Sequence, residues 1–177
     1  MEYISTRNTQ KTFSFKDVFL KGLAPDGGLF VPKIIPVFTP EELKELKNIS
    51  YNELATKIIL KFCSDEFSEE ELKKLIENSY KSFRIKDVVA VKKLGKINLL
   101  ELFHGPTLAF KDIAMQVIGN MYEKILEKNN LRVNIVVATS GDTGAAAISA
   151  IRDRKNIKIF VLHPDNKISE VQRKFMI

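Results

Sequence analysis

The chain has 177 residues, of which 45% are hydrophobic, 28% charged and 9% aromatic, a composition that excludes a disordered protein. The net charge of +6 comes mostly from scattered lysines, without the arginine clusters or stacking motifs of nucleic-acid-binding proteins. No apolar run approaches the roughly 20 residues of a membrane span, and the N-terminus lacks the apolar core of a signal peptide. The single cysteine, Cys63, excludes an internal disulfide and a cysteine-based zinc site. We therefore expect a soluble cytoplasmic protein without a metal, and with neither nucleic-acid nor membrane partners.

The first part of the chain predicts a small module that is mostly helical. Residues 1–38 mix alternating aromatic and polar positions with many glycines and prolines, which indicates strands and turns. Capping boxes begin at Thr39 and Ser68, and apolar residues recur at helical spacing between them. We therefore expect about three helices between residues 40 and 82. Cys63 falls at the end of the middle helix, where a core residue is a better interpretation than a nucleophile.

The second part of the chain predicts an α/β fold. Residues 112–128 carry apolar side chains on one helical face. The β-branched run Val133–Ala138 is followed by the alanine-rich segment Ala145–Ile151 and by the apolar run Asn156–Leu162. A strand, a helix and a strand joined by short connections form a βαβ unit, which indicates a parallel sheet.

The sheet predicted in this way is incomplete. With the alternating segment Val88–Lys92 and the apolar run 97–103, about three or four strands precede the end of the chain, and the outer strands of such a sheet would be bare. Ser169 opens a further capping box, whose helix carries Val171 and Phe175 on one face. We therefore expect a truncated fold that forms the first part of a longer protein.

The stretch HGPTLAFKD at 104–112 is the first candidate for chemistry. Its Gly-Pro pair predicts a tight turn, and Lys111 falls at the start of a helix after apolar neighbours. The positive end of the helix dipole and partial burial both favour an uncharged amine, which a Schiff-base lysine requires. The alternative is an ordinary solvated lysine. The neighbouring His104 is more typical of a structural residue than of a catalytic one.

The stretch TSGDTG at 139–144 is the second candidate and joins a strand to a helix. Its small residues allow a tight turn that presents free N–H groups at a helix N-terminus, which binds carboxylate or phosphate. Ser140 and Thr143 add hydroxyl donors, whereas Asp142 repels an anion and must point away from it or contact another ligand group. The stretch is neither a dinucleotide-binding nor a Walker A loop, and a simple helix cap is the alternative.

Together, the two motifs resemble threonine synthases of the type that has an N-terminal extension. GLAPDGGLFVP at 22–32 and HPDNKIS at 163–169 resemble the same family, so that the resemblance spans essentially the whole chain. It implies that residues 1–84 are the N-terminal module of the family. Residues 85–177 would then be the first, incomplete part of a pyridoxal 5′-phosphate-dependent catalytic domain of fold type II, the fold of tryptophan synthase β.

The resemblance also implies an activity and a set of site residues. The family converts O-phosphohomoserine and water to L-threonine and phosphate with pyridoxal 5′-phosphate as cofactor. By motif position, Lys111 would hold the cofactor as a Schiff base and then act as a general base. The substrate carboxylate would be held by Ser140, Gly141, Asp142, Thr143 and Gly144. Asp142 would also lie near the cofactor, and Lys167 is a candidate for binding the substrate phosphate.

The resemblance leaves two functions open beside threonine synthase. The glycine-rich loop that cradles the cofactor phosphate in this family lies downstream of any equivalent of Ile177, so we expect little or no activity from the 177 residues alone. One alternative is a dehydratase or sulfhydrylase-type enzyme of the same fold, against which the N-terminal module and Asp142 argue. The other is a catalytically incomplete relative that binds a phosphorylated metabolite or a partner subunit. The pattern does not specify an oligomeric state.

Overall fold

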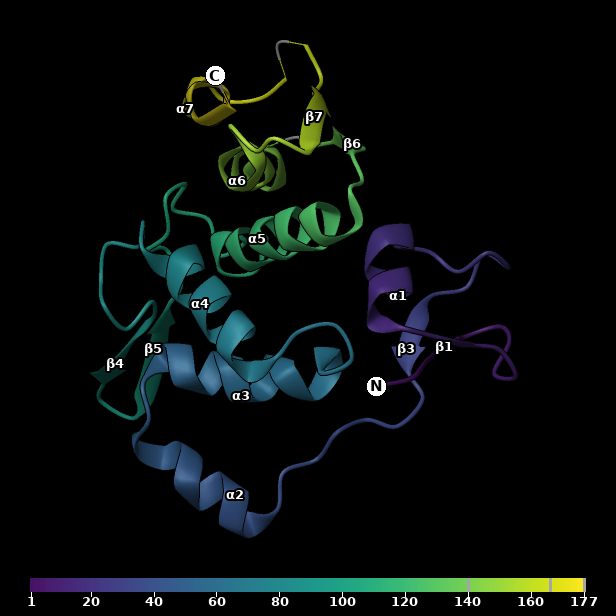
Figure 1. Ribbon diagram of the computed structural model, residues 1–177. Helices are drawn as coiled ribbons and strands as arrows, with labels where there is room; N and C mark the ends of the chain where they lie inside the picture. Colours follow the sequence, from purple (N-terminus) through teal and green to yellow (C-terminus); the bar gives the residue numbers. More distant parts are fainter. Residues whose placement is uncertain (140, 166, 177) are drawn as a thin grey trace. The chain divides into compact units, whose positions relative to one another are not determined.

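The computed structural model describes residues 1–139, 141–165 and 167–176 and divides into two compact units, residues 1–76 and 77–177. Figure 1 shows the elements of both units. Ser140, one of the predicted site residues, lies outside the described residues. Within the described part of the chain, none of the helices combines the length and the apolar character needed to cross a bilayer.

The first unit begins with a small antiparallel sheet in the order β2-β1-β3. Its strands are β1 (Tyr3–Ser5), β2 (Thr12–Phe13) and β3 (Phe30–Pro32), which confirms the strands and turns expected before residue 38. The helix α1 (Phe15–Lys21) was not predicted. It begins because the Ser14 side chain accepts a hydrogen bond from the backbone N–H of Asp17, which caps the first turn.

Three α-helices follow between residues 40 and 80, as predicted. They are α2 (Pro40–Glu45), α3 (Tyr51–Cys63) and α4 (Glu69–Tyr80), with the 3₁₀-helix η1 (Leu46–Asn48) after α2. The predicted capping boxes at Thr39 and Ser68 are both present as reciprocal hydrogen bonds. A third box joins Ser50 to Glu53 at the start of α3 and was missed. The same sequence signal, a serine followed three residues later by glutamate, could have found it.

The core of the first unit encloses Cys63. Cys63 and Leu72 are fully buried, and Phe67 is 2% exposed. The ring of Phe67 meets that of Phe15 edge to face, with centroids 6.2 Å apart. Burial raises the pKa of the Cys63 thiol to about 12, so the thiolate is scarce at neutral pH. The interpretation of Cys63 as a core residue at the end of the middle helix is confirmed.

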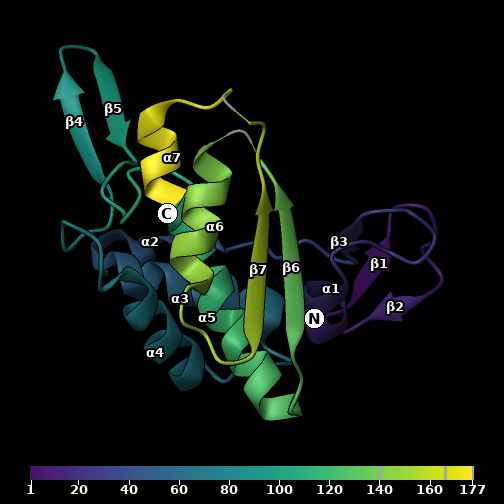
Figure 2. The same cartoon turned by 90° about the horizontal axis from the view of Figure 1, so that it is seen from above.

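The second unit contains the predicted βαβ arrangement. Strand β6 (Val133–Ala138) leads through α6 (Asp142–Ile151) to β7 (Ile157–Leu162), and the two strands are parallel, with Val133 opposite Ile157. Figure 2 shows β6 and β7 side by side with α6 next to them. The helix α5 (Asp112–Asn129) precedes β6, and α7 (Glu170–Met176) ends the described chain beside α6.

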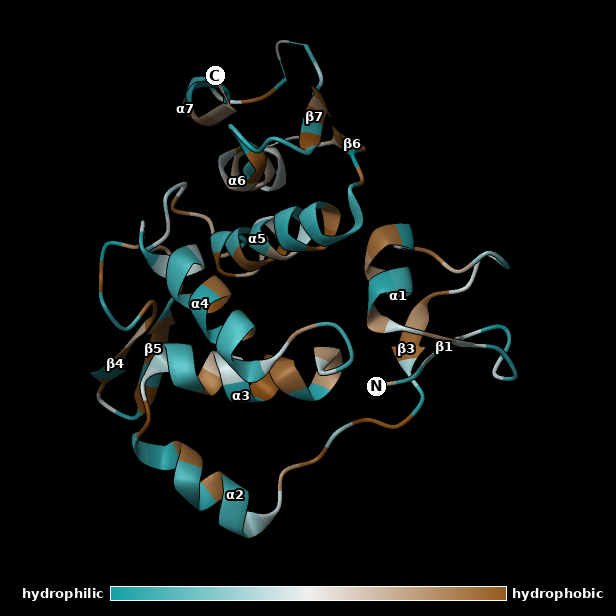
Figure 3. Ribbon diagram, in the orientation of Figure 1, coloured by the Kyte–Doolittle hydropathy of each residue, from teal (hydrophilic) through white to brown (hydrophobic). Residues whose placement is uncertain are grey.

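The parallel sheet has fewer strands than expected. Strands β4 (Ala90–Leu94) and β5 (Ile97–Glu101) pair only with each other, as an antiparallel hairpin, so the described parallel sheet consists of β6 and β7. Figure 3 shows that β6 is mainly hydrophobic. Alternate side chains of the two strands nevertheless stay exposed, including Val136 at 65% and Phe160 at 54%.

The helices of the second unit pack closely because of small residues. Ala146 and Ala150 of α6 are buried, as are Ile125 and Leu126 of α5. A Cβ atom added to Gly119 of α5 would lie 2.6 Å from the backbone oxygen of Ala150. Only glycine fits at this contact between α5 and α6. This packing sets the positions of the N-terminal ends of α5 and α6, where the two candidate motifs lie.

Candidate active site

Lys111 is the residue immediately before α5. The loop that leads to it is held in place by hydrogen bonds to the Asp112 side chain. The Asp112 side chain is fully buried and accepts two hydrogen bonds from Thr107, one from its backbone N–H at 2.8 Å and one from Oγ1 at 2.7 Å. A Cβ atom on Gly105 would lie 2.5 Å from Cβ and Oδ2 of Asp112, so the turn needs glycine there. Leu108 adopts φ +64°, a left-handed conformation that costs a leucine roughly 1–2 kcal/mol. The Thr107–Asp112 contact offsets this strain and fixes the base of Lys111.

The side chain of Lys111 faces the second motif. Its Nζ lies 3.9 Å from Oδ2 of Asp142, at the start of α6, and 4.4 Å from the centroid of the Phe110 ring. The Lys111 side chain is 27% exposed and that of Asp142 is 56% exposed. Lys111 and Asp142, which are 31 positions apart in the sequence, thus bring the two motifs into contact. The sequence alone did not indicate Asp142 as the partner of Lys111.

Thr139 binds the backbone at the start of α6. The Thr139 hydroxyl oxygen accepts hydrogen bonds from the backbone N–H groups of Gly141 and Gly144, both at 3.2 Å. For the N–H groups of Asp142 and Thr143, no acceptor is found among the described residues. These two donors lie in the first turn of α6, where the helix dipole is positive. The start of α6 is thus a place where a carboxylate or phosphate oxygen can bind.

A cavity of about 210 Å³ lies against this loop. It is bordered by the loop before Lys111, by the start of α6 and by α7, with the lining residues Thr107, Leu108, Ala109, Gly141, Asp142, Ala145, Val171, Gln172 and Phe175. The predicted capping box of α7 is present, because Ser169 and Gln172 exchange hydrogen bonds of 3.2 Å. Of the predicted site residues, Gly141 and Asp142 line the cavity, and Lys111 lies 3.9 Å from Asp142 without lining it. Lys167 is exposed in the connection between β7 and α7 and is not among the lining residues.

His104 has a structural environment, as the sequence suggested. Its Nε2 lies 3.1 Å from Oε2 of Glu101, whose other oxygen is 2.6 Å from Nζ of Lys92. Glu101 is only 7% exposed, and the hydrogen bond from Lys92, followed by that from His104, lowers the pKa of its carboxyl group. This pair ties the β4–β5 hairpin to the start of the HGPT turn. Glu101 was missed because it lies inside an apolar strand run that gave no signal of its own.

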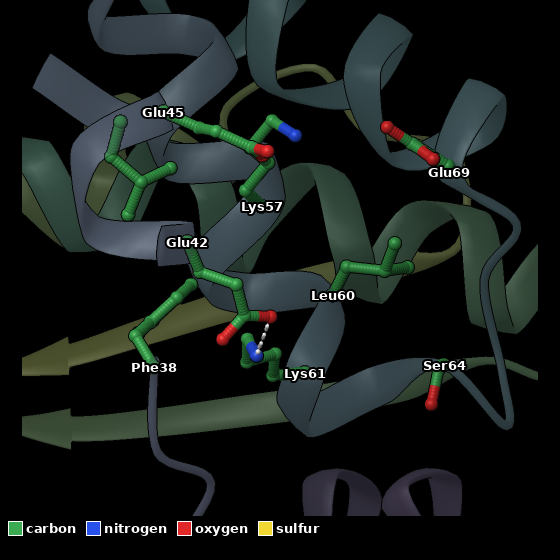
Figure 4. Close-up of a pocket in the computed structure, with 9 residues that line it drawn as sticks. Phe38, Glu42, Glu45, Lys57, Leu60, Lys61, Ser64 and Glu69 are labelled. Carbon is green, nitrogen blue, oxygen red and sulfur yellow. Dashed lines mark hydrogen bonds and ion pairs between the residues drawn. The ribbon is translucent and has the colours of Figure 1, made fainter. Parts of the chain in front are cut away.

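A second hollow, of about 400 Å³, lies in the first unit between α2, α3 and the start of α4 (Figure 4). Its cation Lys61 pairs with Glu42 at 3.0 Å, contacts the backbone oxygen of Val37 at 3.3 Å and lies over the ring of Phe38. Figure 4 shows the ion pair at the side of this hollow. These contacts hold Lys61 between α2 and α3, and Lys57 is a second amine that lines the same hollow.

Comparison with known proteins finds similarity to threonine synthases over nearly the whole chain. The model of the family "Threonine synthase N terminus" matches residues 2–80. Threonine synthase from Pseudomonas aeruginosa is 46% identical over 99% of this chain. The crystal structure of a PLP-bound threonine synthase from Brucella melitensis has 41% identity and a TM-score of 0.94 over 99% of this chain. The chain matches the N-terminal portion of threonine synthases.

The yeast threonine synthase structure gives the same result, with 38% identity and a TM-score of 0.94 over 99% of this chain. In each case the match covers part of the relative. The chain spans 38% of the length of the Pseudomonas, Brucella and yeast threonine synthases. The expected α/β fold of an N-terminal portion is thereby confirmed.

Proposed function

We propose that this chain forms the N-terminal part of a threonine synthase, a pyridoxal 5′-phosphate-dependent lyase that converts O-phosphohomoserine and water to L-threonine and phosphate. The observation that carries the proposal is the meeting of Lys111 with the start of α6, where Nζ lies 3.9 Å from Asp142. An enzyme that acts on an amino acid needs a site that binds the substrate carboxylate and a reactive group close to it. The start of α6 and the amine of Lys111 provide these two features. The similarity to threonine synthases across both motifs supports the same function.

The residues at this site fit pyridoxal 5′-phosphate. Lys111 offers a primary amine that is 27% exposed, so that an aldehyde can reach it, and its partner Asp142 lines the cavity. Its backbone is fixed by the buried Thr107–Asp112 contact, which limits the positions that Nζ can take. When bound, the cofactor supplies a conjugated ring that takes up the electron pair released at the substrate α-carbon. Lys111 would hold it covalently, with Asp142 beside it.

Lys111 would then act as the general base. A free ε-amine at this place can take the proton from the substrate α-carbon, provided that it comes within about 3 Å of that atom. The Asp142 carboxylate lies close enough to orient the amine, since a small side-chain movement converts the 3.9 Å ion pair into a hydrogen bond. The side chain of Asp142 would thus lie beside the cofactor and orient Lys111, while its backbone N–H would face the substrate.

The start of α6 would bind the substrate carboxylate. The donors are the backbone N–H groups of Asp142 and Thr143 and the hydroxyl groups of Ser140 and Thr143. Gly141 and Gly144 would contribute to the shape of the loop rather than as donors, because their own N–H groups already bond to Thr139. Lys167 stays a candidate for the substrate phosphate, on the strength of the motif alone.

A covalent trapping experiment tests this function. The chain is incubated with pyridoxal 5′-phosphate, reduced with borohydride and measured by intact mass, beside Lys111→Ala. A single adduct that is lost in Lys111→Ala is the expected result. Lys174→Ala is a matched control, because Lys174 is an exposed lysine that forms a 3.8 Å ion pair with Glu170. An adduct spread over several lysines, or one that survives Lys111→Ala, would refute the assignment of Lys111.

The proposal extends to domains, activity and location. Residues 1–84 would be the N-terminal module and residues 85–177 the first part of the catalytic domain, in the cytoplasm. Release of phosphate from O-phosphohomoserine by the 177 residues alone is expected to stay close to background. Sustained turnover by this chain would contradict the expectation that further parts of the fold are needed.

A further inference from the structure

We infer that Gln172 of α7 is a substrate-binding residue that donates a hydrogen bond from Nε2 to the substrate carboxylate at the start of α6. The inference rests on the proposed function and adds a residue from an element outside both motifs. It depends on three features of the structure: the orientation of the Gln172 amide, its contact with Gly141, and the free donors around it.

The capping box of α7 fixes which end of the Gln172 amide faces the cavity. Oε1 of Gln172 accepts hydrogen bonds from the backbone N–H and the hydroxyl of Ser169, both at 3.2 Å. The backbone N–H of Ser169 can only donate, so the amide oxygen must face Ser169 and the amide nitrogen must face the other way. The orientation of this amide is therefore set by its partners rather than by free rotation.

The amide nitrogen faces Gly141. A Cβ atom added to Gly141 would lie 2.3 Å from Nε2 and 2.8 Å from Cδ of Gln172, so only glycine allows the amide to lie this close to the loop. Gln172 and Gly141 line the same cavity of about 210 Å³. Among the described residues, no acceptor is found for Nε2. Its two N–H bonds are available to a ligand in the cavity.

The surroundings of Nε2 favour a carboxylate. Asp142 lines the same cavity, and among the described residues its backbone N–H has no acceptor; the N–H of Thr143, likewise without one there, lies in the same first turn of α6. A carboxylate has two oxygens with about four acceptor positions and can use several of these donors together with Nε2. The negative side chain of Asp142 is paired with Lys111, which reduces its repulsion of the bound anion. The positive end of the α6 dipole adds to the attraction.

The variant Gln172→Glu separates this role from a structural one. Glutamate is as good a capping-box residue as glutamine, so the contacts with Ser169 and the start of α7 are retained. The donor Nε2 is replaced by a carboxylate oxygen that repels the ligand. Ser169→Ala is the matched control, because it weakens the cap of α7 and leaves Nε2 in place.

The test is a titration of the ¹⁵N-labelled 177-residue chain, followed by the Gln172 side-chain amide signals and the Thr143 backbone signal. The probes are O-phospho-L-homoserine and 3-aminopropyl phosphate, which is the same molecule without the carboxylate. We expect O-phospho-L-homoserine to shift the Gln172 signals, and Gln172→Glu to raise its dissociation constant at least about tenfold. We expect 3-aminopropyl phosphate to leave the Gln172 signals in place and to bind Gln172→Glu as it binds the wild type.

Several results would overturn the inference. They are an unchanged dissociation constant in Gln172→Glu, an equal loss of affinity in Ser169→Ala, equal shifts with both probes, or no shift at Gln172 with O-phospho-L-homoserine. The proposed function is tested separately by the borohydride adduct at Lys111 of the wild-type chain, a reaction that involves no substrate carboxylate. Failure of one test is therefore distinguishable from failure of the other.

Discussion

Replacing Asp112 by alanine should destabilise the loop that carries Lys111. Asp112 is fully buried and accepts both hydrogen bonds of Thr107, a residue that is itself only 8% exposed. The substitution leaves two buried donors that water cannot readily reach. An unpaired buried donor costs about 1–3 kcal/mol, so we expect Asp112→Ala to lower the free energy of unfolding by about 2–5 kcal/mol.

Two further variants divide this energy between the two hydrogen bonds. Asp112→Asn can keep both contacts, because its carbonyl accepts from the backbone N–H while its NH₂ donates to the Thr107 hydroxyl oxygen, and about 1 kcal/mol is expected. Thr107→Val removes the hydroxyl and keeps the backbone bond. In a double-mutant cycle, Asp112→Ala and Thr107→Val should show a coupling energy of about 0.5–3 kcal/mol.

Urea denaturation measures these free energies, and hydrogen exchange gives a local check. The chain has two compact units that need not unfold together, so the exchange rate of the Thr107 amide is the more direct probe. It should rise strongly in Asp112→Ala, because the bond to Oδ2 is its only protection among the described residues. An unchanged Thr107 exchange rate, or a loss below about 0.5 kcal/mol, would refute the account of Asp112 as the support of Lys111.

Three other predictions follow from burial, charge and packing. The hydrogen bond from Lys92 keeps the pKa of Glu101 below its ordinary value, so its stabilisation is present above the unfolded pKa and is lost as the pH falls through the folded one. Glu101→Gln should therefore lower the unfolding midpoint at pH 7 and much less at pH 3; an equal loss at both would contradict this. Because burial raises the pKa of Cys63 to about 12, iodoacetamide at pH 8 should modify it only after unfolding, and rapid labelling of the folded chain, seen by mass, would exclude the buried position. Gly119→Ala should cost about 1–3 kcal/mol in urea denaturation, because its Cβ would lie 2.6 Å from the Ala150 oxygen, and a neutral effect would show that the α5–α6 contact can give way.

Features that depend on a few neighbouring residues could be predicted from the sequence. The capping boxes at Thr39, Ser68 and Ser169 and the helix after Lys111 all rest on hydrogen bonds or periodicity within one or two turns. The parallel pairing of β6 and β7 follows from the short strand-helix-strand connections in the same way. The helix α1 was missed although its cap is local, because the glycine and proline content around it indicated turns.

Features that join distant segments were decided by the tertiary structure. The sequence named Lys111 and Asp142 separately, but their 3.9 Å approach depends on how α5 and α6 pack. The position of Gln172 against Gly141 likewise needs α7 to return to the start of α6. Local hydrogen bonds are specified by neighbouring residues, whereas a site assembled from three elements is specified only by the packing that brings them together.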